Sequence, residues 1–261
     1  MRRNRFAETS HGFLGRDGQS PGEIASDGRA QLMRYATVVW KEAVVSSARH
    51  ENGRFVVATE EGCGYEGNRV ILATGVQDVL PEIPGLQERW GKSVFHCPYC
   101  HGYELHQGQI GVLANGGLAM HHALLLPEWG STTLFTNGVL EPDQQQLQQL
   151  IARGVRIERE RVTEVTGDGA DVRLADGRVV PLDGLFTTPH TRIPTTLVEQ
   201  FGCALDEGPL GMFVRTDARK QTTTAGVFAC GDVARPAGSV ALAVGDGALA
   251  GTAAHQSLIF H

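Results

Sequence analysis

The sequence predicts an α/β fold with two Rossmann-like domains, each a three-layer ββα arrangement built on a parallel sheet. Short runs rich in Val, Ile and Phe are bounded by Gly, Asn or Asp, which is typical of buried strands. Helical patterns follow several of these runs, and such alternation favours doubly wound parallel sheets. The chain has 261 residues, 33 of them glycine, and is long enough for two domains with their own cores.

Eight segments are expected to be strands, because each is a short apolar run that ends at a turn residue. Two hairpins are expected as well, at 54–74 and 171–185, where a Gly or Asp-Gly turn separates two apolar runs. The expected strands are 36–40, 54–59, 68–75, 109–115, 132–137, 154–158, 171–175 and 226–232.

Three helices are expected from their apolar spacing or their composition. In the second of them Leu147, Leu150 and Ile151 share one face, and Gly154 is a stop signal. The third is Ala-rich and apolar, so we expect it to pack on a sheet. The expected helices are 118–129, 142–154 and 239–260.

Composition narrows the classes of partner and the cellular location. The formal net charge is -6, which gives no reason to expect nucleic acid or an anionic membrane surface as a partner. No apolar run reaches the roughly 20 residues that a membrane helix needs. The basic N-terminus lacks the apolar region of a secretory signal, so we expect a cytoplasmic protein.

The stretch HCPYCHGYE, residues 96–104, holds the chemistry that we expect to matter most. Cys97 and Cys100 form the C-x-x-C pair, Pro98 favours a helix start, and His101 follows directly. A cysteine reacts as its thiolate, and a helix N-terminus, a second cysteine or an imidazole can stabilise that form. An imidazole that titrates near neutral pH suits general acid–base work.

Three other interpretations of this stretch stay open. A zinc site could use both cysteines with His101 and His106, but adjacent Cys100 and His101 make a poor tetrahedron, and no second C-x-x-C exists, so no metal is predicted. CPYC is also the glutaredoxin string, although that fold places it after the first strand of a small domain. Two buried thiols are the third. The remaining cysteines are expected to pack; they are Cys63, Cys203 and Cys230.

Residues 110–123 lie where a dinucleotide loop would lie, after a strand and at the start of a helix. The three glycine slots of that motif hold Ala114, Gly116 and Ala119, and Gly117 follows the second slot. The next strand ends without an acidic residue for a ribose hydroxyl or an arginine for a 2′-phosphate. Because of their place in the loop, Gly116 and Gly117 are still candidate NADPH contacts. The alternative is a Rossmann-like domain that serves as a scaffold and binds no nucleotide.

Two further segments can hold a flavin. One is a buried strand that runs into Ala73, Thr74 and Gly75; the other is a strand that ends at Gly231 and Asp232. An aspartate there can accept hydrogen bonds from ribityl hydroxyls, and the N–H groups of the following helix can meet flavin oxygens or phosphate. The candidate contacts at the start of that helix are Ser239, Val240 and Ala241.

Together with the C-x-x-C, these segments resemble the FAD-dependent pyridine nucleotide-disulfide oxidoreductases of the low-molecular-weight thioredoxin reductase type. The CPYCHGYE and SHGFLG motifs resemble most a subgroup that includes the gliotoxin and holomycin dithiol oxidases. The resemblance implies a discontinuous FAD-binding domain over 1–105 and 194–261. An NAD(P)-binding-like domain is inserted at 106–193, and the implied assembly is a homodimer.

The resemblance also implies roles for the residues of the motif. Cys100 would face the flavin and form the charge-transfer thiolate, while Cys97 exchanges with a small-molecule dithiol or disulfide or with a thioredoxin-like protein. His101 takes the place of an acidic residue and would be the general acid–base, with Glu104 orienting it. His96 is a second candidate for that role. His11 and Val44 join the expected flavin contacts.

One departure from the family pattern concerns the start of the sequence. Relatives begin with a strand, a G-x-G-x-x-G turn and a helix that hold the ADP half of FAD, a unit of about 30 residues. Here the sequence opens on a segment similar to the loop after that unit, so we expect an N-terminally truncated flavin domain with reduced FAD affinity. Open alternatives are a flavin-poor relative without activity, an NADPH-dependent thioredoxin reductase-like enzyme, and a flavin-free zinc or thiol-redox protein.

Overall fold

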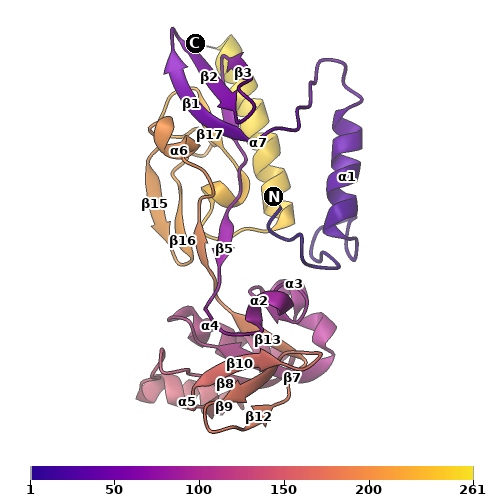
Figure 1. Ribbon diagram of the computed structural model, residues 1–261, viewed down its shortest axis with the longest axis vertical. Helices are drawn as coiled ribbons and strands as arrows, with labels where there is room; N and C mark the ends of the chain where they lie inside the picture. Colours follow the sequence, from indigo (N-terminus) through magenta and orange to yellow (C-terminus); the bar gives the residue numbers. More distant parts are fainter. Residues whose placement is uncertain (1, 261) are drawn as a thin grey trace. The chain divides into compact units, whose positions relative to one another are not determined.

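The computed structural model describes residues 2–260, which divide into two compact units (Figure 1). The first unit comprises residues 3–24 and 79–190, and the second comprises residues 25–78 and 191–260. Each unit has its own sheets and its own buried core, as an α/β domain requires.

The first unit is built on a five-stranded sheet in the order β6-β13-β7-β8-β9, with every neighbouring pair parallel. Parallel strands place their carboxyl ends at one edge of the sheet, which is where α/β folds carry their sites. The strands are β6 (Val94–Phe95), β13 (Gly184–Thr187), β7 (Gln107–Leu113), β8 (Gly130–Phe135) and β9 (Arg156–Glu158).

Helices cover one face of this sheet and a small antiparallel sheet covers the other. Ile110 and Val112 of β7 pack with the helices, whereas Leu113 packs with the antiparallel sheet, and all three are fully buried. Burying one such side chain contributes roughly 1.5–3 kcal/mol. The covering elements are α2 (Leu86–Arg89), α3 (Pro98–His101), η1 (Tyr103–Leu105), α4 (Leu118–Leu125), η2 (Leu126–Glu128), α5 (Gln144–Ala152), β10 (Val162–Thr166), β11 (Asp171–Leu174) and β12 (Val179–Val180).

The second unit contains a two-stranded parallel sheet, β17-β4. An antiparallel sheet in the order β1-β2-β3 and a four-stranded sheet in the order β15-β16-β14-β5 complete it. The bounds are β1 (Val45–Glu51), β2 (Arg54–Thr59), β3 (Gly64–Gly67), β4 (Val70–Leu72), β15 (Leu205–Gly208), β16 (Gly211–Val214), β17 (Val227–Ala229), α6 (Leu197–Gln200), η3 (Gly231–Ala234) and α7 (Val240–Ile259). Three elements lie where the chain passes from one unit to the other: α1 (Pro21–Leu32), β5 (Gln77–Val79) and β14 (His190–Arg192).

The predicted fold class is confirmed, and most of the predicted elements are present. One predicted strand, 36–40, is wrong: Val39 and Trp40 are exposed, and these residues form no ladder. Trp40 is instead held locally, because its indole N–H donates to Glu42 and the Arg29 guanidinium lies over its ring. Ile151 is also exposed, so the predicted apolar face of α5 is narrower than expected.

The first predicted hairpin ends earlier than expected. β2 pairs with β3, whereas 70–72 leaves the hairpin as β4 and pairs with β17. The compact units also differ from the expected domain range of 1–105. β6 pairs with β13 of the insertion, so residues 79–105 fold with the first unit and not with the second.

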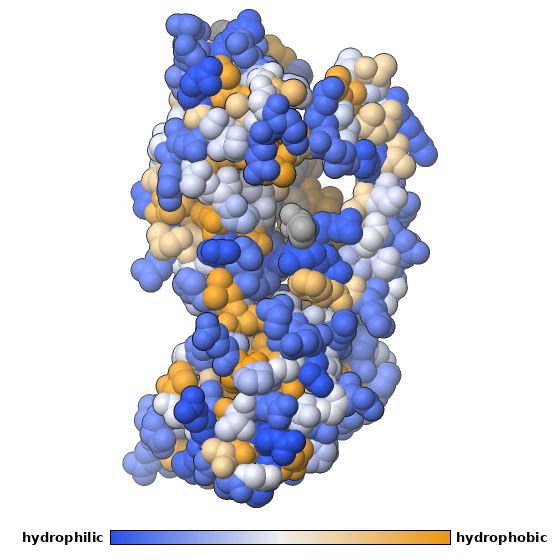
Figure 2. Space-filling model, viewed as in Figure 1, coloured by the Kyte–Doolittle hydropathy of each residue, from blue (hydrophilic) through white to orange (hydrophobic). Residues whose placement is uncertain are grey.

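Hydrophilic residues cover most of the visible face of each unit, and apolar residues are scattered between them (Figure 2). No helix within residues 2–260 combines the length and the apolar character that crossing a membrane demands. The longest helix of the second unit, α7, is rich in alanine.

Candidate functional site

The C-x-x-C pair lies just after β6, at the carboxyl edge of the parallel sheet of the first unit. Cys97 is the N-cap of α3 and Pro98 its first residue, as predicted. Cys97 and Cys100 are joined as a disulfide with their Cα atoms 5.3 Å apart. Gly102 ends the turn where no other residue fits, because a Cβ there would lie 2.7 Å from the Pro98 carbonyl oxygen and 2.8 Å from the Trp129 ring. The disulfide is therefore held on a short, tightly packed helix.

Three imidazoles of the first unit are kept neutral by burial. His101 stacks on Phe95 with ring centroids 4.3 Å apart, and His96 stacks on Trp90 at 5.8 Å. Burial lowers the pKa of His96 to about 3 and that of His101 to about 4. The same cause lowers the pKa of His122, on α4, to about 4. Near pH 7 these three imidazoles are therefore in the neutral form.

The expected pairing of Glu104 with His101 is not what the structure shows. The Glu104 carboxylate lies 3.4 Å from Nε2 of His11, which also lies 3.1 Å from the Thr9 hydroxyl. Nδ1 of His11 is 3.4 Å from Asp17. Residues 3–24 belong to the first unit, so His11 reaches the cysteine segment through Glu104. The sequence could not show this contact because it joins residues 93 positions apart.

Two exposed tyrosines belong to the segment that carries the disulfide. Tyr99, between the cysteines, is 71% exposed, and Tyr103 is 78% exposed. The Tyr99 ring meets Trp129 edge to face, with centroids 5.5 Å apart. Exposed aromatic side chains beside a reactive group offer contact area to a ligand at a low entropic cost. These residues were in the quoted motif but were not singled out from the sequence.

The nucleotide-like loop is open in the structure. Gly116 has φ of 143°, and a Cβ on Gly116 or on Gly117 would meet nothing within 4 Å. The Asn115 side-chain amide donates to the Thr188 carbonyl at 3.1 Å, which ties this loop to the end of β13. The loop thus has room for a ligand, although Ala114 in the first slot is fully packed in the core.

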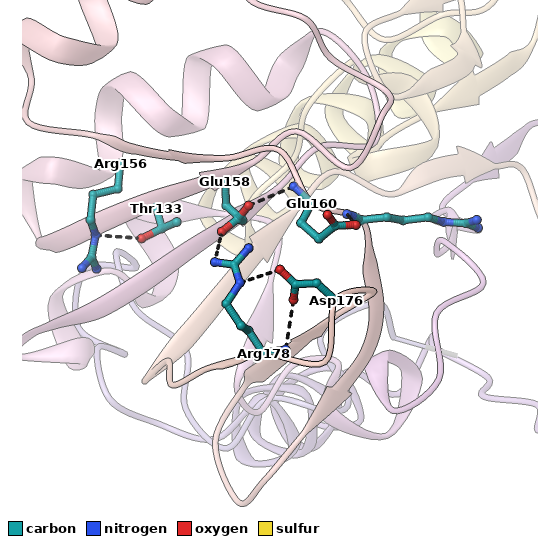
Figure 3. Close-up of polar contacts among 7 residues, drawn as sticks. Thr133, Arg156, Glu158, Glu160, Asp176 and Arg178 are labelled. Carbon is teal, nitrogen blue, oxygen red and sulfur yellow. Dashed lines mark hydrogen bonds and ion pairs between the residues drawn. The ribbon is translucent and has the colours of Figure 1, made fainter.

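An acidic residue that sequence reasoning missed, Glu158, ends β9 directly beside Phe135 of β8. Its carboxylate is already engaged: it accepts from Arg178 at 2.7 Å and from the Glu160 amide at 2.9 Å (Figure 3). Arg178 also donates to Asp176 at 2.6 Å. The Glu158 carboxylate is therefore bound to protein groups, and it ends β9 and not β8, the strand after which a ribose-binding acidic residue would stand.

The predicted flavin segments leave one edge of the β17-β4 pair together. β17 and β4 are parallel, so Ala73, Thr74 and Gly75 emerge beside Gly231 and Asp232. Gly75 and Gly231 have φ of 66° and 71°, which glycine adopts without strain. Ser239, Val240 and Ala241 follow at the start of α7, where the Ser239 hydroxyl accepts from the Leu242 amide at 3.2 Å. Val44 is exposed just before β1.

Two observations bear on whether this edge could hold a flavin. The Thr74 hydroxyl is buried and has no hydrogen-bond partner within the part of the chain that the structure describes. A buried polar atom of this kind needs a partner. Gly238 lies so close to Asp232 that a Cβ would stand 2.7 Å from its carboxyl carbon. A carboxylate, a buried hydroxyl and the N-terminus of α7 therefore follow this edge, and these are the kinds of group that can bind a ribityl chain and a phosphate.

The structure also shows the surroundings of the other three cysteines and the possible metal ligands. Cys63 is exposed in its hairpin turn, whereas Cys203 and Cys230 are buried, which confirms packing for those two. Among residues 2–260, no group of three or more His, Cys, Asp or Glu side chains could hold a metal ion. The cysteines of the motif are bonded to each other.

Comparison with known proteins agrees with this geometry. A family model described as pyridine nucleotide-disulphide oxidoreductase matches residues 14–253. The thioredoxin reductase tcpT of Claviceps purpurea (strain 20.1) is 32% identical, over 98% of this chain and 84% of the relative. The thioredoxin reductase sirT of Leptosphaeria maculans is 30% identical, over 96% of this chain and 82% of the relative.

Solved structures of similar proteins also match this chain over nearly its whole length. The crystal structure of the oxidoreductase from Agrobacterium tumefaciens is 59% identical, with a TM-score of 0.97 over 100% of this chain and 88% of that chain. The crystal structure of HlmI is 34% identical, with a TM-score of 0.91 over 99% of this chain and 82% of that chain.

Proposed function

Because the chain belongs to the pyridine nucleotide-disulphide oxidoreductase family, we propose that it is a flavin-dependent dithiol oxidase working through Cys97 and Cys100. The family is FAD-dependent, and its members act on sulfur groups. The observation that supports the proposal most directly is the disulfide at the start of α3 with two neutral imidazoles around it, His96 and His101.

The proposed exchange at the disulfide proceeds in two attacks. A substrate thiolate attacks Sγ of Cys97, the Cys97–Cys100 bond breaks, and Cys100 leaves as thiolate. The second substrate sulfur then attacks the first in the mixed disulfide and releases Cys97. The substrate loses two electrons and two protons and becomes a disulfide, and the cysteine pair gains the two electrons.

His101 is assigned the proton. Its imidazole is neutral in the oxidised protein, because burial holds its pKa near 4, so it begins the cycle as an acceptor. The negative charge that appears on Cys100 favours the protonated imidazole, since opposite charges nearby stabilise each other. His96 is the second candidate for the same task. Glu104, bound to His11, is assigned to holding the N-terminal loop at this segment.

The flavin would be held by the second unit. The residues assigned to it are Thr74 and Asp232 through their side chains, with the backbone of Ala73, Gly75, Gly231, Ser239, Val240 and Ala241. When bound, FAD would supply the two-electron acceptor that restores the disulfide, with dioxygen as the final oxidant. The proposal includes Val44 and His11 as weaker flavin contacts, a homodimer, a cytoplasmic location, and a small-molecule dithiol or a thioredoxin-like protein as substrate.

The state of the nucleotide-like loop supports the oxidase direction. Ala114 replaces the first glycine of the motif, and β8 is followed by Thr136 and Asn137, so no acidic residue stands there for a ribose hydroxyl. The competing function is an NADPH-dependent thioredoxin reductase-like activity. It is supported by the open space at Gly116 and Gly117 and by the names of the relatives.

An anaerobic experiment separates the two directions. Purified protein carrying FAD is mixed with dithiothreitol or with NADPH, and the visible flavin absorption is followed. The oxidase proposal expects bleaching by dithiothreitol, reversal on admitting air, and no bleaching by NADPH alone. Rapid bleaching by NADPH would replace it with the reductase function, and a purified chain that takes up no FAD would favour the flavin-poor alternative.

A further inference from the structure

A buried carboxylate interrupts the longest apolar helix of the second unit. Asp246 lies in α7, whose other residues are apolar, small or uncharged, and it is only 3% exposed. Glycines precede and follow it in the sequence, so the two neighbouring positions of the helix carry no side chains. A charge in such a place is costly unless it is paired, so its partners are informative.

Two cations from different segments meet this carboxylate. Arg235 donates to it twice, through Nε at 2.6 Å and Nη2 at 2.7 Å, one bond to each oxygen. Lys220 adds its ammonium at 2.9 Å, with a side chain that is 13% exposed. The fork of the arginine fixes both the position and the orientation of the guanidinium.

The partners connect α7 to the carboxyl end of β17. Arg235 directly follows η3 (Gly231–Ala234), the turn that carries Asp232. The Lys220 carbonyl accepts from the Ala229 amide, the last residue of β17, at 3.0 Å. One carboxylate therefore joins the helix, the turn after the strand and the loop beside the strand.

The charges along this connection alternate in sign. Burial alone raises the pKa of Asp246, but hydrogen bonds from Arg235 and Lys220 outweigh it, and the net shift is downward, so the carboxylate stays ionised. Its hydrogen bond with Arg235 raises the pKa of the guanidinium, and the nearby charge of Asp232 adds to that effect. Arg235 thus stands between the two carboxylates.

We propose that Asp246 is a positioning residue for the flavin: by gripping Arg235 it holds the turn 231–234 so that Asp232 is presented at the carboxyl end of β17. The inference rests on the proposed flavin site of the second unit. It adds a residue that acts through Arg235 and is not among the flavin contacts proposed above. Stability alone is a poor explanation for the cluster, because an apolar group of similar volume often serves a core as well as a buried ion pair.

The test compares three variants of the full chain. Asp246→Asn removes the charge that grips Arg235. Arg235→Gln removes the other partner at a less buried position and serves if the first variant does not fold. Ser257→Ala is the matched control, because Ser257 bonds Arg69 at 2.7 Å near the opposite end of the same helix. Each protein is stripped of FAD, and its melting temperature and its FAD dissociation constant are measured, the latter well below the lowest melting temperature.

We expect Asp246→Asn and Arg235→Gln to weaken FAD binding by about tenfold or more, the size of effect that supporting residues have on bound metals. Ser257→Ala should lower the melting temperature and leave the dissociation constant unchanged. Unchanged FAD binding in both cluster variants would overturn the inference, as would weakening that merely follows the melting temperature in all three. Failure of the wild-type chain to bind FAD would instead refute the proposed function.

Discussion

The two units treat their buried ionisable groups in opposite ways. In the first unit, burial keeps His96, His101 and His122 neutral. In the second, Arg235 and Lys220 keep the carboxylate of Asp246 charged. Neutral imidazoles can take up a proton during a reaction, whereas a charge fixed by two cations cannot change easily. The difference fits the proposal that the first unit performs the sulfur chemistry and the second unit holds the cofactor.

The largest expected effect is at the disulfide. Cys100→Ser leaves Cys97 without its partner, so the protein cannot form the disulfide that the substrate dithiol reduces. Dithiol-dependent oxygen consumption should therefore fall below detection. FAD content should be unchanged, because the proposed flavin contacts lie in the second unit, apart from His11, and the substitution alters none of them. Cys63→Ser, at the exposed free cysteine, is the control and should retain full activity. Substantial turnover in Cys100→Ser would contradict the assignment.

Next in size is the stability of the charged cluster. Asp246→Asn leaves Arg235 and Lys220 without a charged partner in a buried place. Breaking a buried pair in this way costs about 3–5 kcal/mol of unfolding free energy. The amide that replaces the carboxylate can still form hydrogen bonds, so we expect a loss of about 3 kcal/mol. Urea unfolding monitored by circular dichroism measures it. A loss below about 0.5 kcal/mol, the usual range for surface substitutions, would show that the cluster contributes no net stability.

The proton acceptor should affect rate and not binding. His101→Gln keeps a polar side chain but removes the proton acceptor, and general acid–base groups contribute at least about 10²-fold. We expect the rate of flavin reduction by dithiothreitol to fall by about that factor, with the pH profile flattened. His121→Gln, at the exposed neighbour of His122, is the control. A normal rate and profile in His101→Gln would transfer the role to His96.

The smallest effect concerns acid stability. Burial lowers the pKa of His122 to about 4, below its ordinary value of 6.5, so the unfolded chain binds this proton more readily. The resulting stability is fully present above pH 6.5 and is lost as pH falls toward 4, by about 2 kcal/mol at pH 5. His122→Leu should reduce this loss, and His121→Leu should not. Parallel stability–pH curves for the wild type and His122→Leu would show that His122 does not contribute to the loss of stability in acid.

Local features of the fold were predictable from the sequence, since they depend on neighbouring residues. Pro98 after Cys97 predicted the start of α3, and the run 132–137 predicted β8. Segment 36–40 has the composition of a strand, but strand formation needs a partner, and Trp40 packs against Arg29 instead. Composition alone cannot distinguish these outcomes.

Contacts between distant segments were not predictable. The pairing of Glu104 with His11 and that of Glu158 with Arg178 depend on how loops return to one sheet edge. One signal was available for the cluster of the second unit. Asp246 is the lone charge in an alanine-rich helix, and a buried charge of that kind always requires partners elsewhere.

The most direct test of the central claim follows electrons from a dithiol to the flavin. Wild-type protein and the Cys97→Ser/Cys100→Ser variant, both loaded with FAD, are titrated anaerobically with dithiothreitol while the visible flavin band is recorded. The account predicts stoichiometric bleaching of the wild type and none in the double variant. Equal bleaching of the two proteins would show that electrons reach the flavin without this sulfur pair, and the account would be wrong.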